Sequence, residues 1–382
     1  MNINITHKRE SIGLQLFDKW YAYRQSVNTS YKSDVSITHT DTTVNDAINI
    51  WFEFIPQVVD KRMIDYDLIF LCNGGEALSA WSSSLMKQLS TKENVYLVAD
   101  ICVAPSHSLY NKIIWHPFDP LNCADYWTRS FYPQYYENHK RLGDKKITNI
   151  FAINGENRAN RKFFFDQLKS QIPSVTIKDT YSHNVGALKK SLWESPEDRE
   201  FREYVNALYN YNTISPDESY YKLYYQSYVN VGQDNKFGKI VPGYFILDDY
   251  FSHHCAVFPE VSWQNDEVCI TEKALKCFYA ECIPMPIGGK GTNQLYNSLG
   301  LYTAWNLLPQ ELQAYDDTKD HLQRYQQQIN AIKWLNDNPQ IFLSDLAIDI
   351  KKSNKTSLLT NTIDYQVVKR FDQLMQRIYA KK

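Results

Sequence analysis

The sequence lacks a strong net charge of either sign. Its 41 Lys and Arg residues nearly balance 43 Asp and Glu residues, which leaves a formal net charge of −2. The chain therefore has no global basic field. A partner as anionic as DNA would have to be held by a local cluster of Lys and Arg side chains.

Long hydrophobic runs are also missing. No N-terminal apolar stretch resembles a signal peptide, and no run approaches the ~20 apolar residues of a membrane span. We therefore expect a soluble, cytoplasmic protein with no membrane partner.

Cysteine patterns of disulfide frameworks and zinc sites are absent too. The chain has 7 cysteines, an odd number, and no two of them form a CxxC pair. Most of them lie inside apolar runs, so we expect reduced, buried thiols. The sequence also shows no internal repeat and no low-complexity tract.

The first half of the chain alternates strand and helix patterns. Buried strands are predicted at 67–72, 95–98 and 112–115, with helical sequence around 77–89. A loop-rich aromatic stretch, 117–144, follows them, and we place a domain boundary at its end. At 382 residues the chain exceeds what one core usually serves, so two domains are expected.

The second half begins a new α/β unit. A strand at 147–153, a helix at 161–171 and a strand at 175–178 are predicted, and the last twenty residues carry a helical apolar stripe. The sequence thus predicts two Rossmann-like α/β domains facing a central cleft. Ligands of open parallel sheets bind beyond the carboxyl ends of the strands, so we expect the site in that cleft.

Residues 268–300 hold the most informative pattern of the chain. A helix predicted to begin near Thr271 would present its positive N-terminal end to a ligand. Glu272 offers two acceptor oxygens suited to ribose hydroxyls, and Lys273 and Lys276 can meet phosphate oxygens. The arrangement can hold a nucleotide sugar. The alternative for an isolated Thr-Glu-Lys tripeptide is a buried helix with a solvated Glu-Lys pair.

A glycine-rich turn follows this helix. Gly288, Gly289 and Gly291 let backbone amides approach a ligand where a side chain would clash. The turn is not a P-loop, because the GxxxxGK[ST] spacing is absent and the glycines follow a helix.

Two patterns could suggest a metal ion. Asp65-Tyr66-Asp67 has the Asp-x-Asp form, but it precedes its predicted strand and so lies at the wrong end of the sheet, where we interpret it as a turn. His253 and His254 are adjacent, and adjacent side chains of an extended chain point to opposite faces. A loop or a nucleotide-side contact is the better interpretation of the two histidines, and we predict no metal site.

Several of these motifs occur in a fixed order. Pro259-Glu260, Ile270 to Lys273, Gly288-Gly289 and Leu299-Gly300 follow one another, and NGENRANRKFFFDQL lies upstream at 154–168. The order resembles that of fucosyltransferase-like glycosyltransferases, and more closely that of relatives encoded by tailed phages. The upstream segment resembles the family's Asn-Arg-x-x-Arg element. The two matches cover about half of the chain.

The resemblance implies a GT-B fold with three parts. Residues 1–145 would form the acceptor-side domain and 146–340 the donor-binding domain, while 341–382 would form a helical segment that packs back on the first domain. Arg158 and Arg161 would stand at a helix N-terminus facing the diphosphate of a nucleotide sugar, for which we expect a UDP-sugar. Ala274 and Leu275 depart from the more polar or aromatic residues that the family pattern leads us to expect.

Sugar transfer to a hydroxyl also needs a base near the acceptor oxygen. By analogy with inverting relatives, the base would lie in the first domain and act in a single displacement. Glu76 and Asp100 each follow a predicted strand there and are the candidates. The alternative for either carboxylate is a helix N-cap or a first-turn acid.

The phage relatives make a hydroxymethylated pyrimidine, such as hydroxymethylcytosine in double-stranded DNA, the leading acceptor. The protein would then act in the host cytoplasm. Arg129, Lys140 and Arg141 belong to a basic and aromatic stretch between the domains that could meet DNA. The alternatives are a cell-surface or protein-linked glycan as acceptor, or a catalytically silent module that binds sugar nucleotides.

Overall fold

The structure of the chain is a computed structural model. The described residues are 1–6, 13–27, 36–54, 65–72, 91–93, 95–99, 102–115, 148–154, 158–179, 187–188, 194–210, 247–260, 262–265, 267–359 and 362–382.

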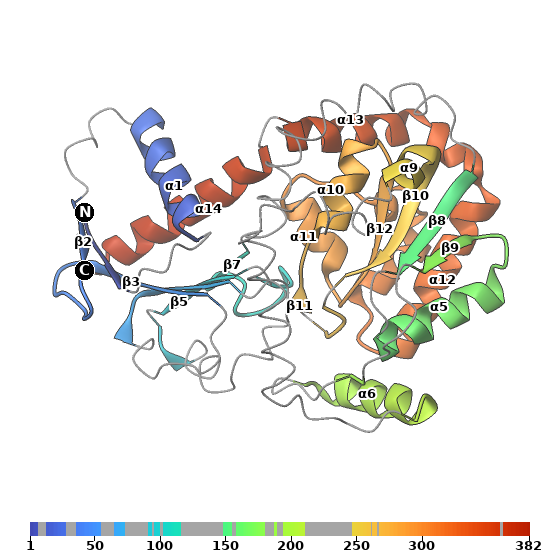
Figure 1. Cartoon of the computed structure of the whole chain (residues 1–382), viewed down its shortest axis with the longest axis horizontal. Helices are drawn as coiled ribbons and strands as arrows, with labels where there is room; N and C mark the ends of the chain where they lie inside the picture. The colour runs from blue at the N-terminus through green and yellow to red at the C-terminus, as the bar shows by residue number, and fades with distance from the viewer. Residues whose placement is uncertain are drawn as a thin grey trace, which may run out of the picture.

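A six-stranded parallel sheet forms the first domain (Figure 1), with the strand order β2-β1-β3-β4-β5-β7. Its strands are β1 (Asn2–Thr6), β2 (Ser36–His39), β3 (Ile48–Phe54), β4 (Leu68–Cys72), β5 (Tyr96–Ala99) and β7 (Ile113–Trp115). The apolar runs correctly predicted β4, β5 and β7. The strands β1, β2 and β3 form the other half of the sheet, which those runs did not indicate.

Local sequence explains the difference between the two halves of this sheet. In β4, Leu68, Ile69 and Phe70 are all buried, as expected for a parallel strand covered on both faces. In β1, polar and apolar residues alternate, yet Asn4 is buried and donates a hydrogen bond of 2.9 Å to Oδ1 of Asn49 in β3. The buried amides are therefore satisfied by each other and by nearby main chain.

The second domain contains a four-stranded parallel sheet in the order β12-β10-β8-β9. Its strands are β8 (Thr148–Asn154), β9 (Thr176–Asp179), β10 (His253–Pro259) and β12 (Ile283–Ile287). In chain order the strands lie 2-1-3-4, the doubly wound arrangement, with its switch point between β8 and β10. The prediction of two Rossmann-like α/β domains is confirmed.

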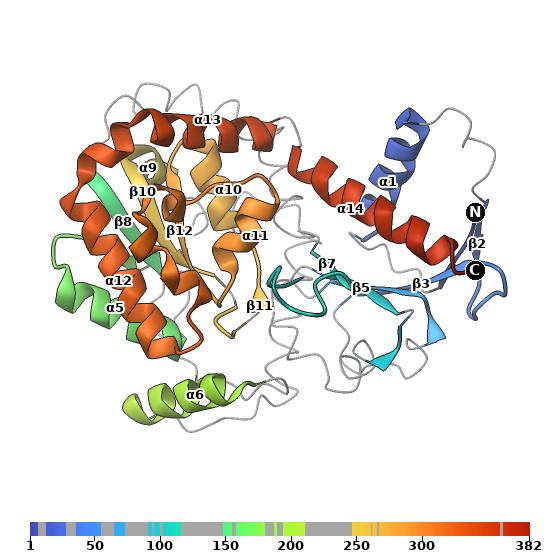
Figure 2. The ribbon, with the colours of Figure 1, turned by 180° about the vertical axis from the view of Figure 1, so that it is seen from behind.

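Helices cover both faces of the second sheet (Figure 2). Ile150 and Ala152 of β8 pack with Phe164 on one face, whereas Phe151 belongs to the core of the other face together with Phe278. The first face carries α5 (Ala159–Gln171), α6 (Pro196–Leu208) and α12 (His321–Asp337). The other helices are α9 (Leu247–Ser252), α10 (Glu272–Tyr279), α11 (Thr292–Ser298) and α13 (Asp345–Leu359), with single turns η6 (Ala304–Leu307), η7 (Gln310–Leu312), η8 (Ala314–Asp317) and η9 (Pro339–Leu343).

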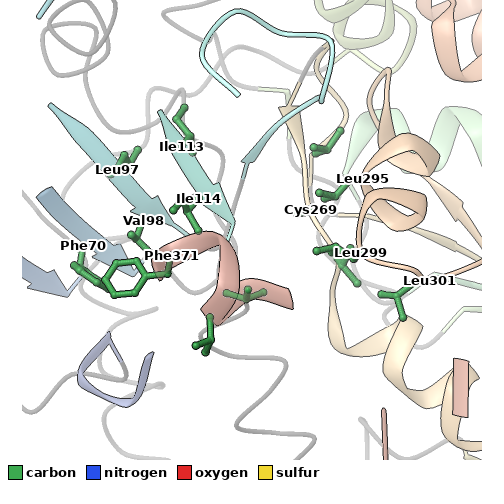
Figure 3. Packing of buried hydrophobic residues seen from close by; sticks show 14 of the residues in the cluster. Phe70, Leu97, Val98, Ile113, Ile114, Cys269, Leu295, Leu299, Leu301 and Phe371 are labelled. Carbon is green, nitrogen blue, oxygen red and sulfur yellow. The ribbon is translucent and has the colours of Figure 1, made fainter. Parts of the chain in front are cut away.

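One of the hydrophobic cores spans both domains. Members from both sides, including Ile113 of β7 and Leu295 and Leu299 of α11, belong to the same buried cluster (Figure 3). A short antiparallel pair joins the domains as well, because β6 (Cys102–Val103) pairs with β11 (Glu267–Val268). Since β6 follows β5 and β11 follows β10, the carboxyl edges of the two sheets meet at this pair.

The last helix, α14 (Thr362–Tyr379), returns to the first domain and packs on α1 (Gly13–Val27), as expected. Phe371 contacts Trp20, and Asp372 accepts hydrogen bonds from Nε1 of Trp20 at 2.8 Å and from Nε of Arg24 at 2.6 Å. The preceding helix α13 instead packs on α10 of the second domain. Of the two α-helices that the structure describes within residues 341–382, therefore, α14 makes the return and α13 does not.

Two further expectations concern the cysteines and the helices. Cys255, Cys269, Cys277 and Cys282 are free and buried, in agreement with the predicted reduced thiols. Across the described residues, no helix combines the length and the apolar character that a membrane span requires.

Candidate functional site

The switch point of the second sheet lies between the carboxyl ends of β8 and β10. After β8 the chain enters α5, and after β10 it enters α10, so the two helices leave the sheet edge on opposite faces. Both are crossovers between parallel strands and begin at this edge. Their positive N-terminal ends therefore flank the switch point, where doubly wound folds bind phosphates.

Thr271 is the N-cap residue of α10 and is only 6% exposed. A threonine at this position usually accepts a hydrogen bond from a first-turn amide, but this side chain makes no capping bond. Among the described residues, its Oγ1 atom has no hydrogen-bond partner. A buried hydroxyl without a partner is costly, and an anion at the start of α10 would satisfy it.

Two predicted lysines lie on α10 in different settings. Lys273 is partly exposed in the first turn, beside Glu272, the first residue of the helix. Lys276 is buried, one turn further along. Lys273 is therefore the more exposed of the two lysines, and a contact of either with a donor stays a prediction. The side chain of Glu272 lies outside the described part of the structure.

The two predicted arginines lie at the start of α5. Arg158 is the N-cap residue and is partly exposed. Arg161 is 3% exposed, and its Nη2 atom donates a hydrogen bond of 3.2 Å to the main-chain oxygen of Glu260. Arg161 thus ties the start of α5 to the end of β10 across the switch point, which leaves Arg158 as the more accessible of the two cations.

Glu260 is buried directly after β10. Its Oε1 atom accepts a hydrogen bond of 2.8 Å from the hydroxyl of Tyr296 in α11. Burial, and then the neighbouring Glu260 carboxylate, raise the pKa of Tyr296 well above its usual value. Tyr296 therefore stays protonated and remains a donor to Glu260.

The glycines after β12 are explained by contacts within the chain. A Cβ atom at Gly289 would lie 2.0 Å from the main-chain oxygen of Gln264, and one at Gly288 would lie 2.5 Å from Oγ1 of Thr292. The close approach to Gln264 requires glycine at position 289, since backbone cannot yield as a flexible side chain can. A role of Gly288 and Gly289 in donor binding stays a prediction.

The N-terminus of α11 is already occupied by a carboxylate. Asp316 accepts hydrogen bonds from the main-chain amides of Asn293 and Gln294, both at 3.0 Å, and from Nδ2 of Asn293 at 2.9 Å. Burial raises the pKa of Asp316 to about 6, although these hydrogen bonds oppose the shift. The first turn of α11 therefore does not offer its Asn293 and Gln294 amides to an anionic ligand.

The Asp-x-Asp pattern lies at the opposite edge of its sheet, as predicted. Asp67 immediately precedes β4, where its Oδ2 atom accepts a hydrogen bond of 2.8 Å from the main-chain amide of Asn49 and pairs with Lys382 at 3.1 Å. Asp67 is therefore engaged in holding the amino ends of two strands together.

The adjacent histidines open β10 at its amino end. Nδ1 of His253 lies 2.7 Å from the main-chain oxygen of Asp249, and the ring of His254 stacks on Phe342. They occupy opposite faces, as predicted. They open β10 rather than lie in a loop, at the end of the strand opposite to the switch point, and a nucleotide-side contact stays a prediction.

Other predicted site residues lie outside the described residues. These are the candidate bases Glu76 and Asp100 and the acceptor-side cations Arg129, Lys140 and Arg141.

Sequence patterns did not indicate Tyr296 or Asp316, which organise this region. Tyr296 is 36 residues from Glu260, and Asp316 is 23 residues from Asn293. No local spacing links such pairs. The sequence signal for such a partner was the charge of Glu260, because a charged residue that ends a buried strand needs a partner somewhere in the fold.

No known protein family matches the sequence, and no curated protein matches it. Among solved structures, the chain is similar to an alpha1,3-fucosyltransferase, with a TM-score of 0.41 and 12% identity over 99% of this chain and 91% of the other. An alpha1,3-fucosyltransferase with GDP-fucose gives 0.40 and 12% over 93% and 82%. A trehalose-6-phosphate protein from E. coli bound with UDP-2-fluoro glucose gives 0.35 and 11% over 94% and 78%. TM-scores and identities this low do not show what the chain does.

Proposed function

We propose that this protein is a glycosyltransferase that takes a sugar from a nucleotide diphosphate donor. The observation that carries the proposal is the pair of helix N-termini at one switch point, with Arg158 on α5 and with Thr271 and Lys273 on α10. Breaking the bond between sugar and diphosphate releases negative charge on the leaving group. Cations and helix N-termini fixed beforehand stabilise that charge as it develops.

Each residue of the site has a distinct role in this proposal. Arg158 and Lys273 contact the diphosphate, and the Thr271 hydroxyl donates a hydrogen bond to a phosphate oxygen. Glu272 accepts hydrogen bonds from the ribose hydroxyls of a UDP-sugar. Arg161, Lys276 and the turn at Gly288 and Gly289 complete the donor side, with the two buried cations adding positive charge behind the ligand.

The acceptor would be activated from the first domain. Glu76 and Asp100 follow β4 and β5 in the chain, and the carboxyl end of β5 leads to β6, which pairs with β11 just before α10. A carboxylate at this edge could remove the proton of an acceptor hydroxyl as the sugar is transferred. Attack opposite the leaving diphosphate would invert the configuration of the sugar.

For the acceptor we propose a hydroxymethylated pyrimidine in DNA. The proposal rests on the resemblance to enzymes of tailed phages and on the basic and aromatic stretch with Arg129, Lys140 and Arg141. Reaching the exocyclic hydroxyl would require the base to leave the stack, at a cost of a few kcal/mol. Transfer of labelled sugar to hydroxymethylcytosine DNA, beside unmodified DNA and a glycan panel, tests this choice. Labelling of glycans alone would replace DNA by a glycan acceptor.

Thermal-shift measurements against a panel of nucleotide sugars test the donor. A ligand that binds only the folded state raises the melting temperature, by an amount that grows with ligand concentration over Kd. We expect one nucleotide sugar, and the matching nucleoside diphosphate, to raise it. Binding without donor hydrolysis or transfer to any acceptor would indicate a silent sugar-nucleotide module. No shift with any member of the panel would contradict the proposed function.

A further inference from the structure

The segment between β10 and α10 leads into the proposed donor site, and it is held from several directions. We name residues 262–265 and 267–268 the donor loop. Gly289 packs against the main-chain oxygens of Gln264 and Glu267 in the donor loop. Val103 of β6, in the first domain, pairs with Glu267 of β11. A group of residues of α6 and α12 holds the first part of the donor loop, 262–265.

Arg324 of α12 is the centre of that group and is fully buried. Its Nη1 atom donates to Oδ1 of Asn265 at 2.5 Å and to the main-chain oxygen of Thr318 at 2.9 Å. Its Nη2 atom donates to the main-chain oxygen of Trp263 at 3.0 Å. One planar guanidinium thus fixes two positions of the donor loop at once, which a lysine ammonium cannot do with the same geometry.

His321 and Asp198 complete the group. Nη2 of Arg324 lies 2.6 Å from Nδ1 of His321, whose Nε2 atom lies 2.6 Å from Oδ1 of Asp198. A guanidinium can only donate, so Nδ1 accepts and the ring proton resides on Nε2. The same Asp198 oxygen accepts from the main-chain amide of Asn265 at 3.0 Å, which adds a further bond to the donor loop.

The charges around His321 agree with this neutral tautomer. Burial, followed by the Arg324 cation, lowers the pKa of His321 to about 4, while Asp198 and Asp320 act in the opposite direction. The ring also stacks on Phe201 with centroids 4.7 Å apart, and the ring of Trp263 packs against it at a tilt with centroids 5.2 Å apart. Besides the bonds to Thr318 and Ser195, the hydrogen bonds of Arg324, His321 and Asp198 run to the donor loop and to one another.

We propose that Arg324 is a positioning residue that sets the place of the donor loop and, through it, of the N-terminus of α10. The proposal rests on the proposed function, because it assigns this position to donor binding. Core packing alone does not require a fully buried arginine here, since apolar residues of similar volume often replace buried ion pairs at no loss of stability. Arg324 instead donates to the loop main chain and to the Asn265 side chain.

Two variants weaken the hold of Arg324 on the donor loop in different ways. Asn265→Ala removes one acceptor from a partly exposed loop position, and Arg324→Lys keeps the charge but removes the planar fork. Asn330→Ala on the exposed side of α12 and Arg199→Lys on α6 are the matched controls. If Arg324→Lys does not fold, Asn265→Ala still decides the question, because it empties no core volume.

The test combines hydrogen exchange with binding of UDP and GDP as probes. We expect amides of residues 267–274 to exchange about tenfold faster in both variants, with β9 and α5 unchanged, and the Kd of the bound diphosphate to rise about tenfold. Both controls should stay within about twofold of the parent. In turnover, the donor KM should rise with kcat retained at saturating donor. A purely structural role would instead lower the melting temperature and raise exchange throughout the domain.

The outcomes separate the two proposals. Unchanged exchange at 267–274 in Asn265→Ala, or faster exchange with unchanged diphosphate affinity in a parent that binds it, would overturn the positioning role. If the parent binds neither UDP nor GDP, the assignment of α10 to donor binding is overturned with the proposed function. Faster local exchange would in that case still support the structural link from Arg324 to α10.

Discussion

The hydroxyl of Tyr296 donates a hydrogen bond of 2.8 Å to the carboxylate of Glu260, and both side chains are buried. The bond connects α11 to the end of β10, beside the main-chain oxygen that Arg161 holds. Two helices and one strand thus converge on Glu260, which lies at the edge where the donor is proposed to bind.

Tyr296→Phe should lower the free energy of unfolding by about 1–3 kcal/mol, because it removes a charge-assisted hydrogen bond inside the protein. Urea unfolding measures the loss. Tyr302→Phe is the control, since the Tyr302 side chain is exposed, and its effect should be within about 0.5 kcal/mol. If the two variants lower the free energy of unfolding equally, the bond to Glu260 stabilises the fold no more than an exposed tyrosine hydroxyl does.

Gly291 and Gly300 form a natural matched pair. Both have positive φ, 84° and 71°, but a Cβ atom at Gly291 would lie 2.5 Å from Cβ of Ala104, whereas one at Gly300 would meet nothing within 4 Å. Each change to alanine should cost about 1–2 kcal/mol for the backbone conformation, and Gly291→Ala should cost more because of the clash. Urea unfolding of both variants measures the difference.

Ala104→Gly provides the second half of that experiment. In the double variant, the loss of stability that the clash at Gly291→Ala causes should disappear, because the two sites are in direct contact. Only the cost of the positive φ at position 291 should remain. If the losses of stability of the two single variants simply add up in the double variant, the close contact between Gly291 and Ala104 is contradicted.

The pH dependence of stability should carry two contributions of opposite sign. The pKa of His321 is lowered to about 4, so on acidification from pH 7 to 4.5 the unfolded chain takes up the proton first and stability falls, by about 2 kcal/mol. The pKa of Asp316 is raised to about 6, so there the folded chain takes up the proton first and stability rises, by about 2 kcal/mol.

Two variants separate these contributions in urea unfolding at pH 7 and 4.5. Relative to the parent, His321→Gln should lose less stability on acidification and Asp316→Asn should lose more. The two variants are each other's control, because all other titrating groups are common to them. A shift of the same sign in both would contradict the assigned protonation states.

Arg158 should matter more to turnover than to acceptor affinity, because its proposed contact is the leaving diphosphate. Arg158→Lys should lower kcat/KM for the donor, since a lysine lacks the guanidinium fork. Steady-state kinetics with varied donor and acceptor measures both effects, and Arg199→Lys is the matched control. A defect in acceptor KM alone would contradict this role.

The sequence predicted those parts of the fold that rest on local pattern. Strands β4 and β5 were recognised because continuous apolar runs are typical of strands buried on both faces. Strand β1 was missed because its alternating Asn and Ile residues indicate no such burial, and Asn4 becomes buried only through its bond to Asn49. Such a long-range bond leaves no local trace in sequence.

The same distinction applies to the candidate site. The start of α10 at Glu272 was predicted from its motif, and so was the start of α5 near Arg161. The pattern could not show that Arg161 is buried against Glu260, or that the first turn of α11 is filled by Asp316. Both depend on which elements the fold brings together, whereas the motif specifies only the helix starts.

The most direct test of the central claim is calorimetric titration of the parent, Lys273→Ala and Thr271→Ala with the nucleotide sugar that the panel identifies. Each change removes a charged or charge-assisted hydrogen bond to the diphosphate, worth about 1.5–3 kcal/mol, so affinity should fall roughly tenfold or more. Lys333→Ala, on the exposed side of α12, should bind as the parent does. Unchanged affinity in folded Lys273→Ala and Thr271→Ala would contradict the placement of the donor at the N-terminus of α10.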